Sequence, residues 1–425
     1  MNISELYELY LQHPSVETDT RKLKKGDIFF ALQGPLFNGN QYAITALAAG
    51  ASFCICDEKQ VEQNDQIIYV KDSLETLQQL AKYHRQQFDI PFIAITGSNG
   101  KTTTKELVNE VLSATYKTYT TEGNLNNHIG VPLTLLRVKK DAEIAVIEMG
   151  ANHQKEIESY CSYSLPTHGI ITNCGKAHLE GFGGEEGVKK GKGELFNYIR
   201  ETNGTAFINT DYDYLIKMST GINKLVPFGE RCGDITGTIA NDETYLEVSI
   251  TKGANISSIS TQLVGGYNLP NILTAVCVGK TFNVPDEHIK AALENYKPTN
   301  SRSQLIQSNS NKIILDAYNA NPTSMKAAIE NFAQMEGEKK VLILGGMMEL
   351  GESSLNEHKE IVNLIAKYTW KNIVLVGKDY TNLPGNFIQF NNSSEAKSWY
   401  QQQKFENAQI LVKGSRSMQM EKVIE

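Results

Sequence analysis

The sequence has no long apolar run, and this absence excludes whole classes of protein. No stretch approaches the roughly 20 apolar residues of a membrane-spanning helix. The first twenty residues combine neither a basic segment nor a continuous apolar one, although a secretory signal needs both. The sequence therefore predicts a cytoplasmic protein without a membrane span.

Cysteine is scarce and scattered. The chain of 425 residues has six cysteines, no two of them form a CxxC pair, and most stand in apolar surroundings. Zinc sites and disulfide frameworks usually show paired or regularly spaced cysteines. We therefore predict buried free thiols at Cys54, Cys56, Cys161, Cys174, Cys232 and Cys277.

Positive charge is not in excess either. Lysine and arginine number 41 against 48 aspartates and glutamates, which gives a formal net charge of -7. Proteins that bind nucleic acid or anionic lipid usually carry a basic surface. Neither partner is expected here, so any anionic substrate must be met by a few locally placed cations.

The length predicts two or three domains, because 425 residues exceed what one typical core can hold. Alternating strand and helix patterns predict an α/β fold throughout, with boundaries near residues 90 and 298. The first domain, 1–90, is a small α/β unit. The central domain, 91–298, has a parallel sheet flanked by helices, with a β-rich insertion at 234–263. A hinge at 297–300 precedes a Rossmann-like α/β domain, 299–425. Predicted strands are 27–32, 52–56, 67–70, 92–96, 144–148, 169–172, 205–209, 312–318, 340–346, 372–377 and 408–414; predicted helices include 42–49, 74–88, 101–114 and one after Asn268.

The segment FIAITGSNGKTTTKE, residues 92–106, carries the strongest chemical signal. A buried strand leads through a glycine-rich turn into a helix, which aims backbone N–H groups and the positive end of the helix at one point. That arrangement suits a polyphosphate, with Lys101 neutralising the outer phosphates and the Thr102 hydroxyl binding Mg2+. The alternative is an ordinary strand-to-helix turn, which the GKT tripeptide in this context disfavours.

Three further groups follow strands of the predicted central sheet and are expected at the same edge. Glu148 ends an apolar strand and could hold Mg2+, although a solvated acid is the default interpretation. His178 lies in a glycine-rich loop and could equally be a surface or core histidine. Lys189, Lys190 and Lys192 would by default form a solvated helix face.

Read in order, these segments resemble a known family. TGSNGKTTT resembles the ATP loop of the Mur ligases and of the related folylpolyglutamate synthetases. Within the Mur ligases, the closer resemblance is to the branch that joins D-alanyl-D-alanine to UDP-N-acetylmuramoyl-tripeptide. It runs over nearly the whole chain and rests on GNLNNHIGVPLTLLR (123–137), EMGANHQKEI (148–157), AHLEGFG (177–183), KGKGELF (190–196), GGYNLPNILTA (265–275), LDAYNANPTSM (315–325) and LVKGSRSMQMEKVI (411–424).

The resemblance implies a role for individual residues. The ATP loop would comprise Gly97, Ser98, Asn99, Gly100, Lys101, Thr102 and Thr103. Thr102 and Glu148 would bind Mg2+, His178 would lie near a second metal, and Lys192 would be carbamylated and also bind metal. Asn268 and Asn271 would face the adenine, Asp316 would contact the nucleotide, and Arg302 would reach the phosphates across the hinge. Thr20 and Arg21 would hold the UDP end of the substrate. Lys101, Lys192, His178 and Arg302 would be the catalytic side chains.

The implied activity is an ATP-dependent amide ligase. A carboxylate is a poor electrophile, so phosphorylation by ATP to an acyl phosphate would activate it for attack by the amine of D-alanyl-D-alanine. A sister ligase that adds the third amino acid and a folylpolyglutamate synthetase are the alternatives that share the ATP loop. A non-catalytic scaffold and a generic P-loop kinase or NTPase come from other classes. A monomer is expected.

Overall fold

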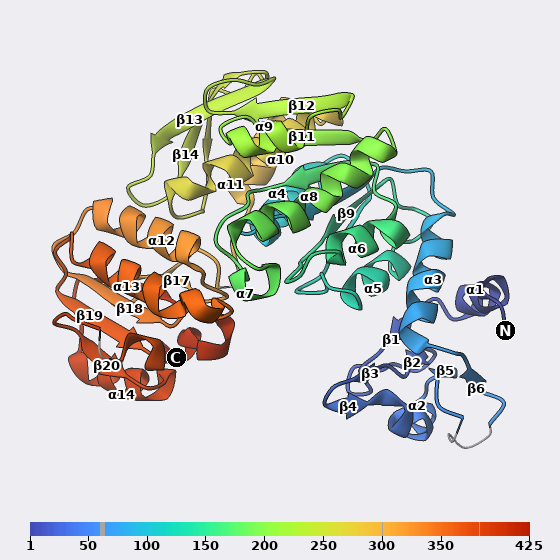
Figure 1. Cartoon of the computed structure of the whole chain (residues 1–425). Coiled ribbons are helices and arrows are strands. Elements are labelled where there is room, and N and C mark those ends of the chain that lie inside the picture. Colours follow the sequence, from blue (N-terminus) through green and yellow to red (C-terminus); the bar gives the residue numbers. More distant parts are fainter. Residues whose placement is uncertain (60–63, 300, 382) are drawn as a thin grey trace.

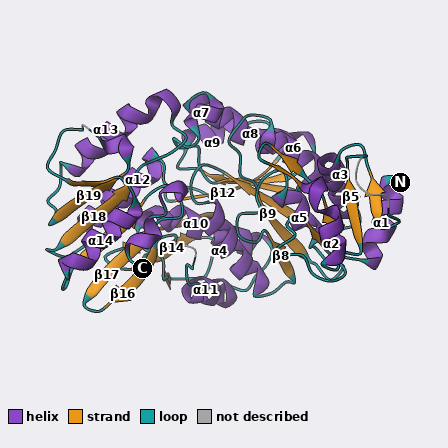
Figure 2. Cartoon of the chain, turned by 90° about the horizontal axis from the view of Figure 1, so that it is seen from below, coloured by secondary structure: helices purple, strands orange, loops and turns teal. Residues whose placement is uncertain are grey.

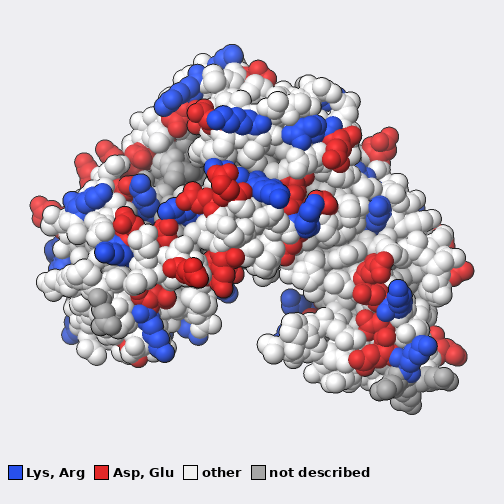
Figure 3. All heavy atoms as spheres, in the orientation of Figure 1, with Lys and Arg blue, Asp and Glu red and all other residues white. Residues whose placement is uncertain are grey.

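The computed structural model describes residues 1–59, 64–299, 301–381 and 383–425. It consists of three α/β units, each built on its own sheet, and the central unit joins two separate lobes (Figures 1 and 3). None of the helices in the described residues is long and apolar enough to cross a membrane. All six cysteines are free, as predicted. Four are buried and Cys174 is half-buried, but Cys232 is exposed, so the prediction of a buried thiol is wrong for Cys232.

The first unit is a four-stranded parallel sheet with helices packed against it. Its order is β1 (Val16–Glu17), β2 (Ile28–Phe30), β5 (Phe53–Cys56) and β6 (Ile67–Tyr69). A short hairpin, β3 (Gln33–Gly34) and β4 (Phe37–Asn38), and the helices α1 (Ile3–Gln12), α2 (Ala43–Ala48) and α3 (Ser73–Arg85) complete it. Asp72 caps α3 by accepting a hydrogen bond from the backbone N–H of Glu75 at 2.7 Å. The strands and helices predicted for this unit are present.

The central unit contains a nine-stranded sheet in the order β15-β14-β13-β12-β11-β10-β7-β9-β8. Its parallel strands are β7 (Phe92–Thr96), β8 (Thr118–Thr120), β9 (Ile144–Glu148), β10 (His168–Ile171), β11 (Thr205–Asn209) and β12 (Lys224–Gly229). The predicted β-rich insertion is β13 (Ile235–Asn241), β14 (Glu247–Lys252) and β15 (Ser258–Ser260), which pair antiparallel with one another. β8 and β12 were not predicted.

Helices cover both faces of this sheet because its strands are apolar on both sides (Figure 2). Ile93 and Ile95 belong to the apolar cluster of α4 and α10, whereas Phe92 and Ala94 belong to the cluster on the opposite face. The helices are α4 (Lys101–Ser113), α5 (Gly130–Leu136), α6 (Glu156–Ser164), α7 (Leu179–Phe182), α8 (Glu185–Glu201), α9 (Asp213–Met218), α10 (Leu269–Thr281) and α11 (Asp286–Asn295).

The third unit is a six-stranded sheet in the order β16-β17-β21-β18-β19-β20. The four predicted strands are β17 (Asn311–Asp316), β18 (Lys340–Gly345), β19 (Asn372–Val376) and β21 (Gln409–Lys413), and all pair in parallel. Two edge strands escaped prediction: β16 (Gln304–Ser308), which is antiparallel, and β20 (Ile388–Phe390). The helices are α12 (Pro322–Gln334), α13 (Ser354–Ile365) and α14 (Ser393–Gln403).

The predicted domain boundaries at residues 90 and 298 fall in the connections between α3 and β7 and between α11 and β16. They stay predictions, and Asn300, the last residue of the predicted hinge, lies outside the described residues. The carboxyl ends of the central parallel strands and the amino end of α12 in the third unit line one cleft.

Candidate active site

A cleft of about 920 Å³ lies between the central and third units. Its lining comes from the ATP loop, the end of β9, the loop after β10, the start of α10, the segment before β16 and the segments that follow β17 and β18. Most of the predicted site residues line it, namely Ser98, Asn99, Gly100, Lys101, Thr102, Thr103, Glu148, His178, Asn268, Asn271, Arg302 and Asp316.

Two glycines give the ATP loop its shape. Gly97 and Gly100 have φ angles of 144° and 80°, in the region that favours glycine. A Cβ atom on Gly97 would lie 2.0 Å from the Thr172 hydroxyl oxygen, and one on Gly100 would lie 2.6 Å from Oδ1 of Asn271. Gly100 is also the residue that precedes α4. The backbone therefore turns tightly enough for the amino end of that helix to face the cleft.

Lys101 lies in the first turn of α4 and folds back over the loop. Its Nζ donates to the carbonyl oxygens of Gly97 at 2.7 Å and Ser98 at 3.1 Å. Burial is the main reason that the pKa of Lys101 is lowered, to about 8. The negative charge of Glu148 raises this pKa in part, and the positive charge of Arg302 lowers it. The cleft thus holds two cations close enough to interact, which an added polyphosphate would stabilise.

Glu148, at the end of β9, is fully buried and only partly hydrogen-bonded. Its Oε1 accepts from the Thr102 hydroxyl at 3.1 Å and from the Asn126 amide at 2.7 Å. Its Oε2 is buried and has no hydrogen-bond partner among the described residues. A buried carboxylate oxygen without a partner is costly, and a hard divalent cation is the ligand that oxygen donors of this kind prefer.

Lys192 does not belong to a solvated helix face, so that default interpretation is wrong for this residue. The side chain of Lys192 is fully buried, its Nζ donates to the carbonyl oxygen of Ala151 at 2.9 Å, and it lies 5.0 Å from the centre of the Phe182 ring. Burial, and then the charge of Lys101, lower the pKa of Lys192 to about 7. By contrast, Lys190 is exposed and Lys189 pairs with Glu186 at 2.6 Å.

His178 has a positive φ of 53°, and its side chain contacts the third unit. Its Nδ1 forms an ion pair with Oε2 of Glu349, and this contact lowers the pKa of Glu349. The structure thus brings Thr102 and Glu148 into contact but turns His178 toward Glu349. Throughout the described ranges, no three His, Cys, Asp or Glu side chains gather as a metal site.

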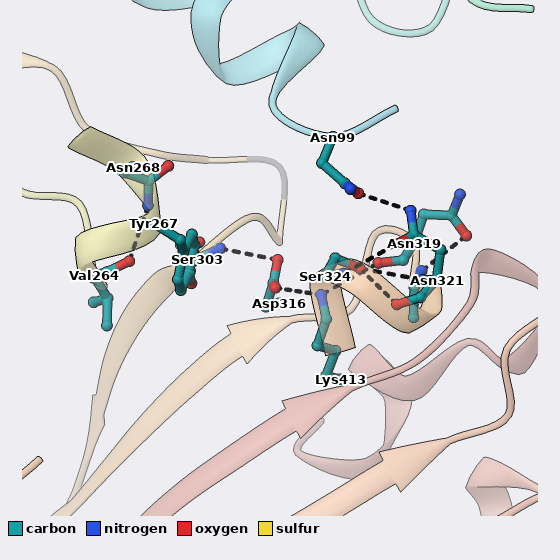
Figure 4. Close-up of polar contacts among 11 residues, drawn as sticks. Asn99, Val264, Tyr267, Asn268, Ser303, Asp316, Asn319, Asn321, Ser324 and Lys413 are labelled. Carbon is teal, nitrogen blue, oxygen red and sulfur yellow. Dashed lines mark hydrogen bonds and ion pairs between the residues drawn. The ribbon is translucent and has the colours of Figure 1, made fainter. Parts of the chain in front are cut away.

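The third unit contributes a cation and a carboxylate to the cleft. The guanidinium of Arg302 lies 3.7 Å from the centre of the Tyr318 ring, and its Nε is buried without a hydrogen-bond partner among the described residues. Asp316 forms an ion pair with Lys413 and accepts a hydrogen bond from the backbone N–H of Ser303 at 3.2 Å (Figure 4). Both side chains are therefore held in place at the edge of the cleft.

The two predicted adenine-facing residues lie at the start of α10, opposite Asp316. Nδ2 of Asn271 donates to Oδ1 of Asn268 at 2.9 Å, and Nδ2 of Asn268 donates to the carbonyl oxygen of Val264 at 2.9 Å. Asn271 also accepts from the Thr104 hydroxyl at 3.0 Å, which ties it to the ATP-loop helix. This amide chain fixes the wall of the cleft.

Thr20 and Arg21 are not part of this cleft. Arg21 is largely exposed and forms a double hydrogen bond with the carboxylate of Asp19, with both distances 2.8 Å. The structure therefore keeps this predicted UDP contact apart from the ATP loop, on the first unit, and its role stays a prediction.

Sequence reasoning missed several residues that shape the site. Three of them, Asn126, Tyr318 and Lys413, lie inside the sequence blocks that resemble the family. None of them belongs to a motif whose residue spacing would by itself indicate a role in the site. Glu349 lies in a turn of the third unit, and its pairing with His178 depends on how the units are placed. Only its position as the last residue of β21, in register with Asp316 at the end of β17, could have pointed to Lys413.

The fold and the cleft define a three-unit α/β enzyme with a phosphate-binding loop at the carboxyl edge of its central sheet. Family models match most of the chain: the "Mur ligase family, catalytic domain" at 14–85, the "Mur ligase middle domain" at 95–279 and the "Mur ligase, glutamate ligase domain" at 301–416. The chain belongs to the Mur ligase family.

Individual relatives agree with this assignment. The chain is 34% identical to the UDP-N-acetylmuramoyl-tripeptide--D-alanyl-D-alanine ligase of Bacillus subtilis, over 100% of this chain and 97% of that protein. It is 36% identical to the Escherichia coli protein of the same name, over 96% and 92%. Among solved structures, MurF from Acinetobacter baumannii is 32% identical and superposes with a TM-score of 0.88. The match covers 96% of this chain and 92% of the Acinetobacter chain. MurF from Thermotoga maritima in complex with ADP is 27% identical, with 97% of each chain covered and a TM-score of 0.87.

Proposed function

We propose that this protein is an ATP-dependent ligase that joins D-alanyl-D-alanine to the terminal carboxylate of UDP-N-acetylmuramoyl-tripeptide, a step of peptidoglycan precursor synthesis. The observation that carries the proposal is that Lys101, Arg302 and Glu148 line one cleft, and that Oε2 of Glu148 has no hydrogen-bond partner within the described part of the chain. The names of relatives at 34% and 36% identity over nearly the full length support the choice of both substrates.

The chemistry begins with activation of the acceptor. The tripeptide carboxylate attacks the γ-phosphate of ATP, and ADP leaves. Lys101 and Arg302 neutralise charge on the transferred phosphoryl group, and the amino end of α4 contributes backbone N–H groups. The product is an acyl phosphate, whose carbonyl carbon is electrophilic enough for attack by an amine.

The second half forms the amide. The amine of D-alanyl-D-alanine, once deprotonated, attacks the acyl carbon, and the tetrahedral intermediate expels inorganic phosphate. Water would hydrolyse the acyl phosphate, so the cleft must exclude it while both substrates are bound.

Mg2+ fits the residues of this chain. Thr102 and Glu148 would hold it, since Glu148 is buried and, among the residues described, one carboxylate oxygen has no partner while the other accepts from two neutral donors. The bound ion would supply positive charge beside the phosphates. Carbamylation of Lys192 is proposed on separate grounds. Its buried amine, with a pKa of about 7, is substantially neutral at physiological pH, and only a neutral amine can take up CO2.

Asn126 supplies a prediction about the metal. Its amide fixes Oε1 of Glu148, so Asn126→Ala frees the carboxylate to rotate and leaves it with one donor fewer. We expect affinity for Mn2+, read by electron paramagnetic resonance in the presence of ADP, to fall by roughly 10- to 100-fold. Asn124→Ala, which changes another asparagine of the cleft wall, is the matched control. Unchanged Mn2+ affinity in Asn126→Ala would show that Asn126 does not orient a metal ligand.

The reaction can be tested with the purified protein, ATP, Mg2+ and UDP-N-acetylmuramoyl-tripeptide, supplied with a panel of amines. We expect phosphate release only when D-alanyl-D-alanine is present, and a product with the mass of the UDP-N-acetylmuramoyl-pentapeptide. In parallel incubations, addition of a third amino acid to the UDP-linked dipeptide precursor, or of glutamate to a folate, would instead indicate one of the alternative ligases. Phosphate release with no amine would indicate a simple NTPase.

The setting follows from the substrates. ATP and a UDP-linked precursor are both cytoplasmic molecules, so we place the reaction in the cytoplasm. A monomer is proposed because all the proposed catalytic groups come from one chain, and sedimentation of the protein with ATP would test this.

A further inference from the structure

The first turn of α12 joins the third unit to the ATP loop. Nδ2 of Asn321, the residue that caps α12, donates to Oδ1 of Asn99 at 2.7 Å (Figure 4). Two residues later, Thr323 accepts a hydrogen bond from the backbone N–H of Lys176 at 3.0 Å. The Lys176 side chain also forms an ion pair with Glu357 at 2.7 Å. One helical turn of the third unit thus contacts two loops of the central unit.

Both of those loops belong to the phosphate site and are themselves joined. The backbone N–H of Asn99 donates to Oδ1 of Asn173 at 3.1 Å, and Nδ2 of Asn173 donates to the carbonyl oxygen of Asn99 at 3.0 Å. The Ser98 hydroxyl donates to the carbonyl oxygen of Gly175 at 2.9 Å. The backbone of Asn99 is therefore fixed by the loop after β10, while its side chain points to α12.

Asn321 is preorganised for this contact. Its Oδ1 accepts from the backbone N–H of Ser324 at 2.9 Å, its backbone N–H donates to the Ser324 hydroxyl at 3.1 Å, and Pro322 follows it. This capping box fixes the amide rotamer, so that the Nδ2 donor is free to reach the central unit. Asn321 is 9% exposed, and therefore the hydrogen bond is shielded from water.

We propose that Asn321 is a positioning residue that docks the third unit onto the ATP loop and so delivers Arg302 and Asp316 to the nucleotide. Both of those residues belong to the same unit as α12 and line the same cleft. A shift of the unit by about 1 Å would misplace them enough to slow the reaction strongly. The contact is made to the loop that holds the phosphates, so nucleotide binding and docking are coupled. This inference rests on the proposed ATP-dependent ligase function.

Asn321→Asp separates docking from helix capping. Aspartate caps a helix as well as asparagine does, because its carboxylate still accepts from the backbone N–H of Ser324. It cannot donate to Oδ1 of Asn99. The Asn99 amide can still turn and present its Nδ2, which has no partner among the described residues, so Asn99→Ala, which removes that group, is the second variant. Asn392→Asp is the matched control, since Asn392 caps α14 in the same manner, through Glu395, away from the cleft.

We expect kcat of Asn321→Asp to fall by roughly 10- to 100-fold. Because nucleotide binding and docking are coupled, its Kd for a fluorescent ATP analogue should rise as well, but by a smaller factor than the loss of kcat. The activity of Asn392→Asp should not change. Asn99→Ala combined with Asn321→Asp should cost no more than the larger single change. Wild-type kcat in both Asn321→Asp and Asn99→Ala, or a loss of ATP affinity in Asn321→Asp as large as its loss of kcat, would overturn the proposal.

A second readout does not depend on ligase activity. Energy transfer between labels on Cys232, exposed in the central unit, and on Ser398→Cys, in α14, reports the distance between the two units. ATP should shift the wild-type protein toward one docked distance, and Asn321→Asp should stay broadly distributed at saturating ATP. An identical response of both proteins would overturn the docking role. If the wild-type protein shows the shift but ligates no amine, the proposed function fails while the docking role stands.

Discussion

Lys101→Met should reduce ligase turnover by roughly a thousand-fold. The change keeps most of the side-chain volume and removes the cation that contacts the ATP loop, so that charge on the transferred phosphoryl group loses its nearest compensation. Nζ of Lys101 lies 2.7 Å from the carbonyl oxygen of Gly97, which is part of the ATP loop. Single-turnover formation of the amide product, measured with ATP above its Kd, reports this step directly.

The control for Lys101→Met is Lys290→Met, which removes a partly exposed lysine from α11 on the central unit. Lys290 pairs with Glu294 at 3.7 Å, a surface interaction worth little. We expect this variant to retain wild-type turnover. Turnover of Lys101→Met within ten-fold of wild type would show that phosphoryl transfer does not use this loop.

Lys192→Met should lower turnover by a factor on the order of a hundred to a thousand while making the protein more stable. Stability increases because the lysine is protonated in the unfolded chain at neutral pH, and the free energy of burying it in place of water disfavours folding. The pKa of Lys192 is about 7 in the folded chain and 10.5 as its ordinary value. Between these values the unfolded chain binds more protons, so the free energy of unfolding rises as pH rises from about 7 to about 10.5.

Methionine removes this pH dependence. In CO2-free buffer at pH 7 we expect Lys192→Met to raise the free energy of unfolding by about 1 to 2 kcal/mol, and the difference from wild type should shrink as the pH approaches 10. Lys190→Met, an exposed change on the same helix, should alter neither turnover nor stability. A Lys192→Met protein that is both active and less stable would show that the lysine has a structural role only.

The fold could be predicted well because the apolar patterns are strong. Strands β7, β9 and β11 begin and end at the predicted residues, since each is a short, almost fully buried run between polar segments. Edge strands were missed for the opposite reason. β20 has only three residues, of which Ile388 and Phe390 are half-buried and Gln389 is exposed, and β16 is half-buried over most of its length, so neither strand shows a clear apolar pattern.

The candidate site could be predicted in its composition but not in its contacts. The ATP loop and Glu148 follow strands of one parallel sheet, which places them at one edge. The pairing of His178 with Glu349 and the docking of Asn321 on Asn99 join residues more than 150 positions apart in the chain. Local patterns carry no information on such contacts. The burial of Lys192 was hidden because three lysines in a short segment usually indicate a solvated helix face.

The central claim is that this cleft activates a carboxylate by phosphoryl transfer from ATP. UDP-N-acetylmuramoyl-tripeptide labelled with 18O in its terminal carboxylate tests that claim most directly, because the attacking oxygen stays on the phosphoryl group when the amide forms. We predict that one 18O atom appears in the released inorganic phosphate for each amide bond made. Label in AMP, or none in phosphate while amide accumulates, would contradict the account.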